Sequence, residues 1–373
     1  MNEKQFLKDL QELVNIDCGT YTPKGVNLVV DKLIKHFTQM QYFTKRIELS
    51  KEVGPLLIAY NKKDADCYDA IIIGHTDTVY QEGTVKDHKM EVKDNKAYGL
   101  GTIDMKAGLL LAIYAVKTLP QDLQDLSLCF IFNPDEEISS IYSEQEILKL
   151  AKKSKCALVV EAPETEGYIV TKRKGIARFV VSFTGKAAHA SVPSHGASAI
   201  MELANFILRL KVFNNDKLNT TFNVSPIKGG TAVNVVAENA YLEFEIRFLS
   251  DKEYQTMYNK IRDFENTPIT EGVKIVISQL SFKPALNNSE ENQWIEEIGL
   301  AAGKKLGMPL EKLTSSGGSD GNSISYAGVP TLDGLGPIGY GWHNATLECL
   351  HINTLKPKML LLQQILREIK ERK

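Results

Sequence analysis

Histidine and carboxylate residues directly follow, in the sequence, apolar segments that are typical of buried strands. The residues in this position are His75 and Asp77 after DAIIIG, Glu136 and Glu137 after LSLCFIF, and Glu161 after CALVV. In a mostly parallel sheet the carboxyl ends of the strands meet at one edge, where α/β proteins place their sites. We therefore expect these side chains to lie close together. Three adjacent acidic residues, beginning at Asp135, repel one another there unless a cation or a proton relieves the repulsion.

Two further residues suit the same kind of site. Asp104 begins an apolar helical stretch, and His343 lies in the glycine-rich segment GYGWHNATLECL. Each candidate has a structural alternative, because Asp104 can cap a helix and an acidic turn or a loop histidine can simply be solvated. Residues 99–108 lack the third glycine and the later acidic residue of a dinucleotide-binding loop. As a set, the histidines and carboxylates are the ligand type expected for a pair of zinc, cobalt or manganese ions.

The elements that must position these residues change character along the chain. Up to TKRKG (171–175), short apolar strands alternate with amphipathic helices, which predicts a mostly parallel α/β sheet with helices on both faces. The order then becomes strand, helix, strand, strand, helix, strand. In YLEFEIRF (241–248) apolar and polar residues alternate, as in an antiparallel sheet with one buried face. We expect an α/β catalytic domain, residues 1–174 and 285–373, interrupted by an α+β domain at 175–284.

Composition excludes several classes of protein. The 373 residues include 44 basic and 46 acidic side chains, and this balance argues against a broad nucleic-acid-binding surface. Five scattered cysteines without CxxC spacing argue against a disulfide scaffold and favour a reducing, cytoplasmic location. The N-terminal segment lacks the apolar core of a signal peptide, and the longest apolar run, 107–116, is short of the about 20 residues of a membrane span.

The motifs and their order resemble the co-catalytic zinc amidohydrolases. The residues that carry the resemblance are His75-Thr-Asp77, Gly-Thr-Ile-Asp104-Met-Lys-Ala-Gly108, Glu136-Glu137, Glu161-Ala-Pro, Gly185-Lys-Ala-Ala-His189-Ala, Asn234, Arg247, Gly-Gly-Ser-Asp (317–320) and Gly-Trp-His343. The family contains glutamate carboxypeptidase, aminoacylase, acetylornithine deacetylase, succinyl-diaminopimelate desuccinylase and the tripeptide aminopeptidases. The resemblance runs over nearly the whole chain and implies an inserted, ferredoxin-like lid that forms a homodimer.

The resemblance also implies the metal ligands. His75, Asp104 and Glu161 match the ligands of one Zn²⁺ ion. Asp104, Glu137 and His343 match those of a second Zn²⁺ ion, so that Asp104 bridges the two. Co²⁺ or Mn²⁺ can substitute for zinc.

Three other residues match positions that serve the reaction. Asp77 matches the residue that orients a ligand histidine through its far ring nitrogen. Glu136 matches the general base, which takes a proton from water and returns it to the leaving nitrogen. His189 matches a lid histidine that stabilises the oxyanion, often from the partner subunit, although a turn histidine bonded to backbone is its alternative. In the family, a cis peptide bond follows the aspartate that matches Asp104.

Four positions are expected to contact the substrate, namely Asn234, Arg247, Lys283 and Gly318. Their alternatives are local: the asparagine can end a turn, the glycine can be a flexible turn residue, and Arg247 can pair with Glu245 or Glu243 on its own strand. Lys283 stands where the carboxypeptidase branch has an arginine. A lysine holds a carboxylate as a point charge without the planar pair of donors, so recognition of a C-terminus is expected to be looser or differently placed.

We therefore expect a cytoplasmic dizinc hydrolase that cleaves an amide or peptide bond next to a free carboxylate, as a glutamate-carboxypeptidase-like exopeptidase. An N-acyl-amino-acid deacylase acting on acetyl or succinyl groups would use the same metals and base. A third class is a family member that binds metal or peptide without catalysis, and the complete ligand set together with Glu136 argues against it. The expected partners are a small peptide or N-acyl amino acid and a second copy of the chain, with neither nucleic acid nor membrane.

Overall fold

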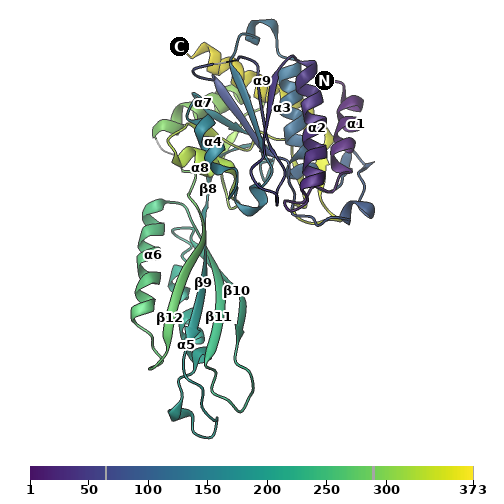
Figure 1. The fold of residues 1–373 in the computed structure, drawn as a ribbon. Coiled ribbons are helices and arrows are strands. Elements are labelled where there is room, and N and C mark those ends of the chain that lie inside the picture. The colour runs from purple at the N-terminus through teal and green to yellow at the C-terminus, as the bar shows by residue number, and fades with distance from the viewer. Residues whose placement is uncertain (64, 288–289, 373) are drawn as a thin grey trace. The chain divides into compact units, whose positions relative to one another are not determined.

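The computed structural model describes residues 1–63, 65–287 and 290–372. It divides into two compact units, which we call unit 1 (Met1–Lys172 and Asn288–Lys373) and unit 2 (Arg173–Asn287). Figure 1 shows a helix-covered sheet in unit 1 and a separate sheet with two helices in unit 2. The predicted fold class, an α/β domain interrupted by an α+β insertion, is confirmed. Among the described helices, none combines the length and hydropathy that a membrane crossing needs.

The main sheet of unit 1 is mixed. Its strands, in spatial order, are β1 (Phe43–Ile47), β2 (Leu56–Tyr60), β6 (Leu128–Asn133), β3 (Ala70–His75), β7 (Ala157–Val159) and β14 (Thr331–Leu332). The pairs β6–β3, β3–β7 and β7–β14 are parallel, whereas β1–β2 and β2–β6 are antiparallel. Because β3, β6 and β7 run in one direction, their carboxyl ends meet at the same edge of the sheet.

Helices cover both faces of this sheet (Figure 1). Successive side chains of a strand point to opposite faces, so Ile72 packs into one apolar core and its neighbour Ile71 into another. The helices of the first core are α1 (Glu3–Val14), α2 (Pro23–Gln39), α3 (Ala107–Lys117), α7 (Glu290–Lys305) and α9 (Leu355–Glu371). Those of the second are α4 (Glu144–Ala151) and α8 (Asp320–Tyr326). Burial on both sides explains why β3 and β6 read as continuous apolar runs.

Two smaller sheets complete unit 1. One has the order β15-β16-β5-β4, formed by Gly339–Tyr340, Cys349–His351, Lys96–Tyr98 and Glu91–Lys93. The other pairs β13 (Glu311–Ser315) with β8 (Tyr168–Arg173). The pairing of β16 with β5 brings a C-terminal segment beside the residues that precede Asp104.

Unit 2 is an antiparallel sheet with helices on one face. Its strands, in spatial order, are β10 (Thr221–Gly229), β11 (Asn239–Phe248), β9 (Gly175–Thr184) and β12 (Lys274–Lys283), and its helices are α5 (Ala199–Leu210) and α6 (Asp251–Asn266). On β11, Phe244 and Ile246 are buried in the core, while Glu245 and Arg247 are half-exposed. The predicted alternation of a buried and a polar face is therefore confirmed. Each buried phenylalanine of this core stabilises the unit by about 1.5–3 kcal/mol relative to an exposed one.

Candidate metal centre

A buried histidine at the end of β3 faces two carboxylates. His75 is only 1% exposed, and its Nε2 lies 3.0 Å from Asp104 Oδ1 and 3.5 Å from Glu161 Oε1. Glu161 follows β7, whose carboxyl end lies beside that of β3. The shared direction of the two strands thus places both side chains at one edge of the sheet.

A second histidine approaches the other side of Asp104. His343 Nε2 lies 3.1 Å from Asp104 Oδ2 and 3.4 Å from Glu137 Oε2. The backbone of His343 has a φ of +60°, a left-handed conformation that is uncommon for a residue other than glycine. Asp104 therefore presents one oxygen to each histidine, and a glutamate stands beside each pair.

The segment that carries Asp104 closely approaches the sheet. Asp104 lies in the turn Thr102–Lys106 that leads into α3. The backbone of Asp104 is not helical, with φ −122° and ψ 86°, and its peptide bond to Met105 is cis. A Cβ atom at Gly108 would lie 2.1 Å from the carbonyl oxygen of Val160. Only glycine permits this approach of α3 to the end of β7. Without it, Asp104 would be displaced from the residues at that edge.

Asp77 connects the first histidine with the acidic turn. His75 Nδ1 lies 3.3 Å from Asp77 Oδ1 and 3.0 Å from the Asp77 carbonyl oxygen. The Asp77 carboxylate also accepts the backbone N–H groups of Glu136 and Glu137 at 3.2 and 3.3 Å, and the Thr20 hydroxyl at 2.7 Å. A partner at Nδ1 leaves Nε2 directed at Asp104. Asp77 thereby fixes the ring of His75 and the turn of both glutamates.

The three carboxylates of the acidic turn after β6 have different surroundings. Glu136 and Glu137 begin a 3₁₀ turn and are half-buried. Burial raises the pKa of Glu161, and the nearby charge of Glu136 adds to this shift. Asp135 instead accepts the backbone N–H of Tyr142 at 2.7 Å. One oxygen of Asp135 thus holds the following loop, while burial and the nearby charge of Asp77 raise the pKa of Asp135. Its membership of the crowded acidic group at the site stays a prediction.

The electrostatics of the centre fit a bound cation. Burial, reinforced by the charge of Asp104, raises the pKa of Glu137 and of Glu161, while the Asp104 and Glu137 carboxylates raise the pKa of His343. Burial opposes ionisation of Asp104 as well, but the two histidines lower its pKa well below the usual range. Among the described residues, the buried Glu137 Oε1 has no hydrogen-bond partner. An unsatisfied buried carboxylate oxygen is costly, and a metal ion would satisfy it.

The donor set agrees with this conclusion. One ligand atom each of His75, Asp104 and Glu137 lie within 4.8 Å of one another. Imidazole nitrogens combined with carboxylate oxygens suit zinc, cobalt and manganese. Of the predicted site residues, the structure brings all five expected ligands together with Asp77 and the turn of Glu136.

The five residues expected to act on the substrate are divided between the two units. His189, Asn234, Arg247 and Lys283 belong to unit 2, whereas Gly318 lies in unit 1 before Ser319, the N-cap residue of α8. His189 is exposed, with Nδ1 2.7 Å from the Ser191 hydroxyl. Arg247 Nε donates to Glu245 Oε1 at 2.7 Å, which is the local alternative expected from its strand. The structure places the first four within unit 2 and Gly318 within unit 1, and the roles of all five stay predictions.

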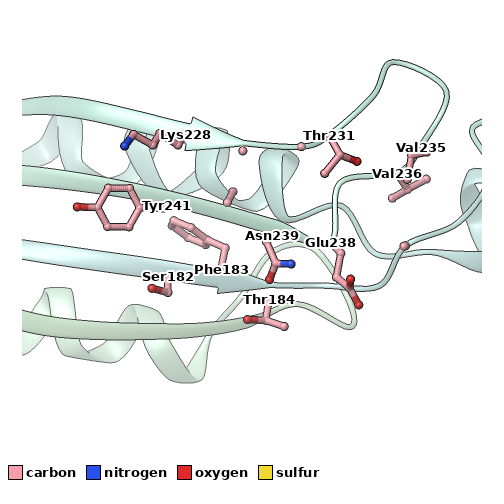
Figure 2. A pocket seen from close by; sticks show the side chains of 14 residues that line it. Ser182, Phe183, Thr184, Lys228, Thr231, Val235, Val236, Glu238, Asn239 and Tyr241 are labelled. Atoms are coloured by element: carbon pink, nitrogen blue, oxygen red, sulfur yellow. The ribbon is translucent and has the colours of Figure 1, made fainter.

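Unit 2 also contains a hollow of about 430 Å³ (Figure 2). It lies where the ends of β9 and β10 meet the start of β11, with Thr184, Lys228 and Asn239 among its lining. Among the described residues, this lining includes neither His189 nor Asn234, although Val235 belongs to it. The hollow is therefore next to the loop that carries Asn234 but is distinct from the predicted substrate contacts.

Two supporting carboxylates were not singled out from the sequence. Glu348 is buried and accepts backbone N–H groups of the turn that carries Asp104. Asp320, at the start of α8, accepts hydrogen bonds from Asn133 and Ser140, on either side of the acidic turn. The only signals for these residues were the nearness of Glu348 to His343 and the Gly-Gly-Ser-Asp motif that Asp320 ends.

Comparison with known proteins identifies the family. The sequence model of peptidase family M20/M25/M40 matches residues 71–368, well over half of the chain. The chain belongs to this family. The suspected relationship to the co-catalytic metallopeptidases is therefore confirmed, and the protein is a metallohydrolase of peptide or amide bonds.

Individual relatives agree with this assignment. Carboxypeptidase G2 from Pseudomonas sp. (strain RS-16) is 26% identical over 375 residues, covering 97% of this chain and 89% of that protein. Acetylornithine deacetylase from Vibrio parahaemolyticus is 26% identical over 254 residues, covering 64% of this chain and 66% of that protein. The crystal structure of aminopeptidase PepT from Bacillus cereus ATCC 10987 has a TM-score of 0.83 at 24% identity and covers 99% of both chains, which shows a shared fold.

Proposed function

We propose that this M20 family member is a dizinc exopeptidase that cleaves an amide bond next to a free carboxylate. The observation that carries the proposal is the Asp104 carboxylate, whose two oxygens lie 3.0 and 3.1 Å from the Nε2 atoms of two different histidines. One shared carboxylate between two histidine and glutamate pairs is the ligand arrangement of a two-metal hydrolase. His75 and Glu161 would hold one ion, His343 and Glu137 the other, and Asp104 both.

The chain's own residues then divide the reaction between them. Zinc, when bound, supplies a Lewis acid for the amide carbonyl and lowers the pKa of the attacking water. Glu136 accepts the proton of that water and delivers it to the leaving nitrogen. The backbone N–H of Glu136 donates to Asp77, and its side chain is not assigned as a metal ligand. Asp77 keeps the Nε2 atom of His75 directed at the centre.

The residues of unit 2 serve the substrate in this proposal. His189 donates a hydrogen bond to the carbonyl oxygen as negative charge develops on it. Asn234, Arg247 and Lys283 bind the free carboxylate, together with backbone N–H groups near Gly318. The similarity to carboxypeptidase G2 over 97% of the chain supports a C-terminal carboxylate as the recognised group. The similarity to acetylornithine deacetylase supports the alternative, an N-acyl amino acid.

A second copy of the chain is the expected partner. Helix α5 exposes Met201 and Leu208, which are 58% and 61% accessible, and Val212 follows at 65%. Strand β10 is an outer strand, and one of its edges has no strand partner among the described residues. An apolar helix face beside an open strand edge is typical of an association surface. We propose a homodimer through unit 2, which sedimentation of the protein and of Leu208→Glu would test, with a monomeric wild type as the contradicting result.

A reducing, cytoplasmic location is also part of the proposal. All five cysteines are free, and four of them are buried. Cysteines without a disulfide suit a reducing compartment. Fractionation of the source cells would test this, since recovery of the enzyme outside the cytoplasm contradicts it.

A substrate screen on metal-depleted and reloaded protein tests the activity. Peptides and acyl-glutamates with a free C-terminal carboxylate would be compared with N-acetyl and N-succinyl amino acids, each with and without added zinc, cobalt or manganese. C-terminally amidated copies of the same peptides are the matched control. We expect hydrolysis only after metal is restored and only when the carboxylate is free. Faster cleavage of the N-acyl amino acids would establish the deacylase, and metal-independent hydrolysis would contradict the site.

A further inference from the structure

One buried carboxylate of unit 1 collects four hydrogen bonds without facing either histidine of the metal centre. Glu348 is 1% exposed. Its Oε1 accepts the backbone N–H groups of Ile103 and Asp104 at 3.1 and 3.3 Å. Its Oε2 accepts the backbone N–H of Gly101 at 2.9 Å and the hydroxyl of Tyr80 at 2.7 Å. Both oxygens are thus occupied by donors of the chain. This carboxylate is therefore a poor metal ligand and a good anchor for the turn before α3.

The main chain of the same residue connects the two segments that supply metal ligands. The N–H of Glu348 donates to the carbonyl oxygen of Asn344, next to His343, at 2.9 Å. The carbonyl oxygen of Glu348 accepts the N–H of Gly99 at 3.1 Å, at the start of the Asp104 turn. Side chain and backbone together therefore hold the Asp104 turn against the His343 loop, although these segments are separated by more than 200 residues in the sequence.

We propose that Glu348 is a positioning residue that sets the distance between the Asp104 carboxylate and His343, and so the affinity of the centre for its second metal ion. The inference rests on the proposed roles of Asp104 and His343 as ligands. Groups that fix a metal ligand without touching the ion typically change metal affinity about 10- to 100-fold when they are replaced. A residue with a purely structural role would change the stability of the fold and leave metal affinity unaltered.

Glu348→Gln separates these two roles because it keeps the shape of the side chain. The amide offers one acceptor oxygen and one NH₂ group. The NH₂ group cannot accept hydrogen bonds, so it meets donors of the chain without bonding to them on one side of the side chain. The turn then shifts, and with it Asp104. Glu202 in unit 2 provides the matched control, since it is also fully buried and accepts the N–H groups of Ile269 and Thr270 at 3.1 and 2.5 Å.

The experiment is a titration of each metal-depleted protein with Co²⁺, followed by the visible absorption of the bound ion and combined with a thermal melt. We expect Glu348→Gln to raise the Kd of the weaker Co²⁺ site about 10- to 100-fold and to alter its spectrum. Glu202→Gln is expected to lower Tm and to keep the wild-type Kd and spectrum. Tyr80→Phe removes one donor of the four and is expected to raise the Kd by less than the about 10-fold lower bound expected for the main variant.

The outcomes separate this inference from the proposed function. Wild-type protein that binds no Co²⁺ would contradict both. Wild-type protein that binds two ions, with a Kd that Glu348→Gln leaves within twofold, would overturn only the positioning role. If Glu348→Gln fails to fold, Tyr80→Phe decides: a raised Kd at unchanged Tm supports the role, and an unchanged Kd contradicts it.

Discussion

The candidate residues of the two units are held in different ways. In unit 1, Asp77 accepts donors that lie 57 to 60 positions away in the sequence, and Glu348 accepts donors about 245 positions away. In unit 2, the side chains of His189 and Arg247 form hydrogen bonds with Ser191 and Glu245, each two positions away, and His189 is exposed. Contacts between distant segments of unit 1 therefore fix the geometry of its candidate ligands. The exposed ring of His189 is instead held by a local hydrogen bond to Ser191.

Because of this difference, we expect substitutions in the two units to cause different losses of function. Changes among the supporting residues of unit 1 should weaken metal binding. Changes in unit 2 should impair turnover or substrate affinity while the metal content stays that of the wild type. The predictions below test this separation.

The largest effect is expected for Glu136→Gln. Glu136 belongs to the candidate metal centre of unit 1 but holds no metal in our assignment. An amide cannot accept the proton of the attacking water, so kcat should fall by about 10²- to 10⁴-fold. The metal content should remain that of the wild type by elemental analysis. Glu146→Gln, a change in an exposed ion pair on α4, is the matched control. Retained turnover would remove Glu136 from the role of general base.

A smaller loss is expected for His189→Ala in unit 2. Removing one donor to an oxyanion typically lowers kcat by about 10²- to 10³-fold, and metal content should not change. His195→Ala, at another exposed position of unit 2, is the control. Mixing His189→Ala with Glu136→Gln chains then locates the histidine: recovered activity places it across a dimer interface, and no recovery places it within one chain. Loss of metal from His189→Ala would contradict the expectation that changes in unit 2 leave metal binding unaltered.

Asp77→Asn should affect metal binding first. The amide weakens the contact with His75 Nδ1 and places an NH₂ group against the N–H of Glu136 or Glu137. We expect metal affinity to fall by about 10- to 100-fold and activity to recover at high zinc concentration. Competition with a chelator measures this directly. An activity loss that excess metal fails to restore would show that Asp77 acts on the glutamates more than on His75.

The smallest effect on activity is expected for Lys358→Met, a change in the core of unit 1. Burial lowers the pKa of Lys358 to about 7, and its Nζ donates to the carbonyl oxygen of Gly334 at 2.9 Å. In the unfolded chain a lysine has a pKa of about 10.4. Between these values the unfolded state binds more protons, so the free energy of unfolding rises with pH. Below pH 7 both states are charged, and the burial cost is fully present.

The measurement is chemical denaturation of wild type and Lys358→Met at pH 6, 8 and 10. The difference in unfolding free energy should change with pH at up to about 1.4 kcal/mol per pH unit, with the wild type gaining relative to the variant. Hydrolysis at a fixed pH should be unchanged. A pH-independent difference would show that Lys358 has an ordinary pKa in the folded protein.

The clustering of His75, Glu161 and the acidic turn at one edge of the main sheet could be predicted from the sequence, because parallel strands end at the same edge. The apolar runs before His75 and Glu161 are buried on both faces, so their continuity identifies them as central strands. Asp104 and His343 were found only through spaced motifs and family resemblance, since nothing local links residues so far apart. The hydrogen bonds of Glu348 and Asp320 could not be predicted, because they depend on how distant segments pack. The small sheet of β15, β16, β5 and β4 was missed because strands of two or three residues leave no periodic pattern.

Metal stoichiometry tests the central claim, that unit 1 holds two ions through a shared Asp104, most directly. Wild type, His343→Ala and Asp104→Ala would each be saturated with zinc, dialysed and measured for zinc per chain, with circular dichroism to confirm folding. The account predicts two ions for wild type, one for His343→Ala and fewer than one for Asp104→Ala, because both ions depend on the shared carboxylate. Two ions retained by a folded Asp104→Ala, or no more than one in the wild type, would contradict it.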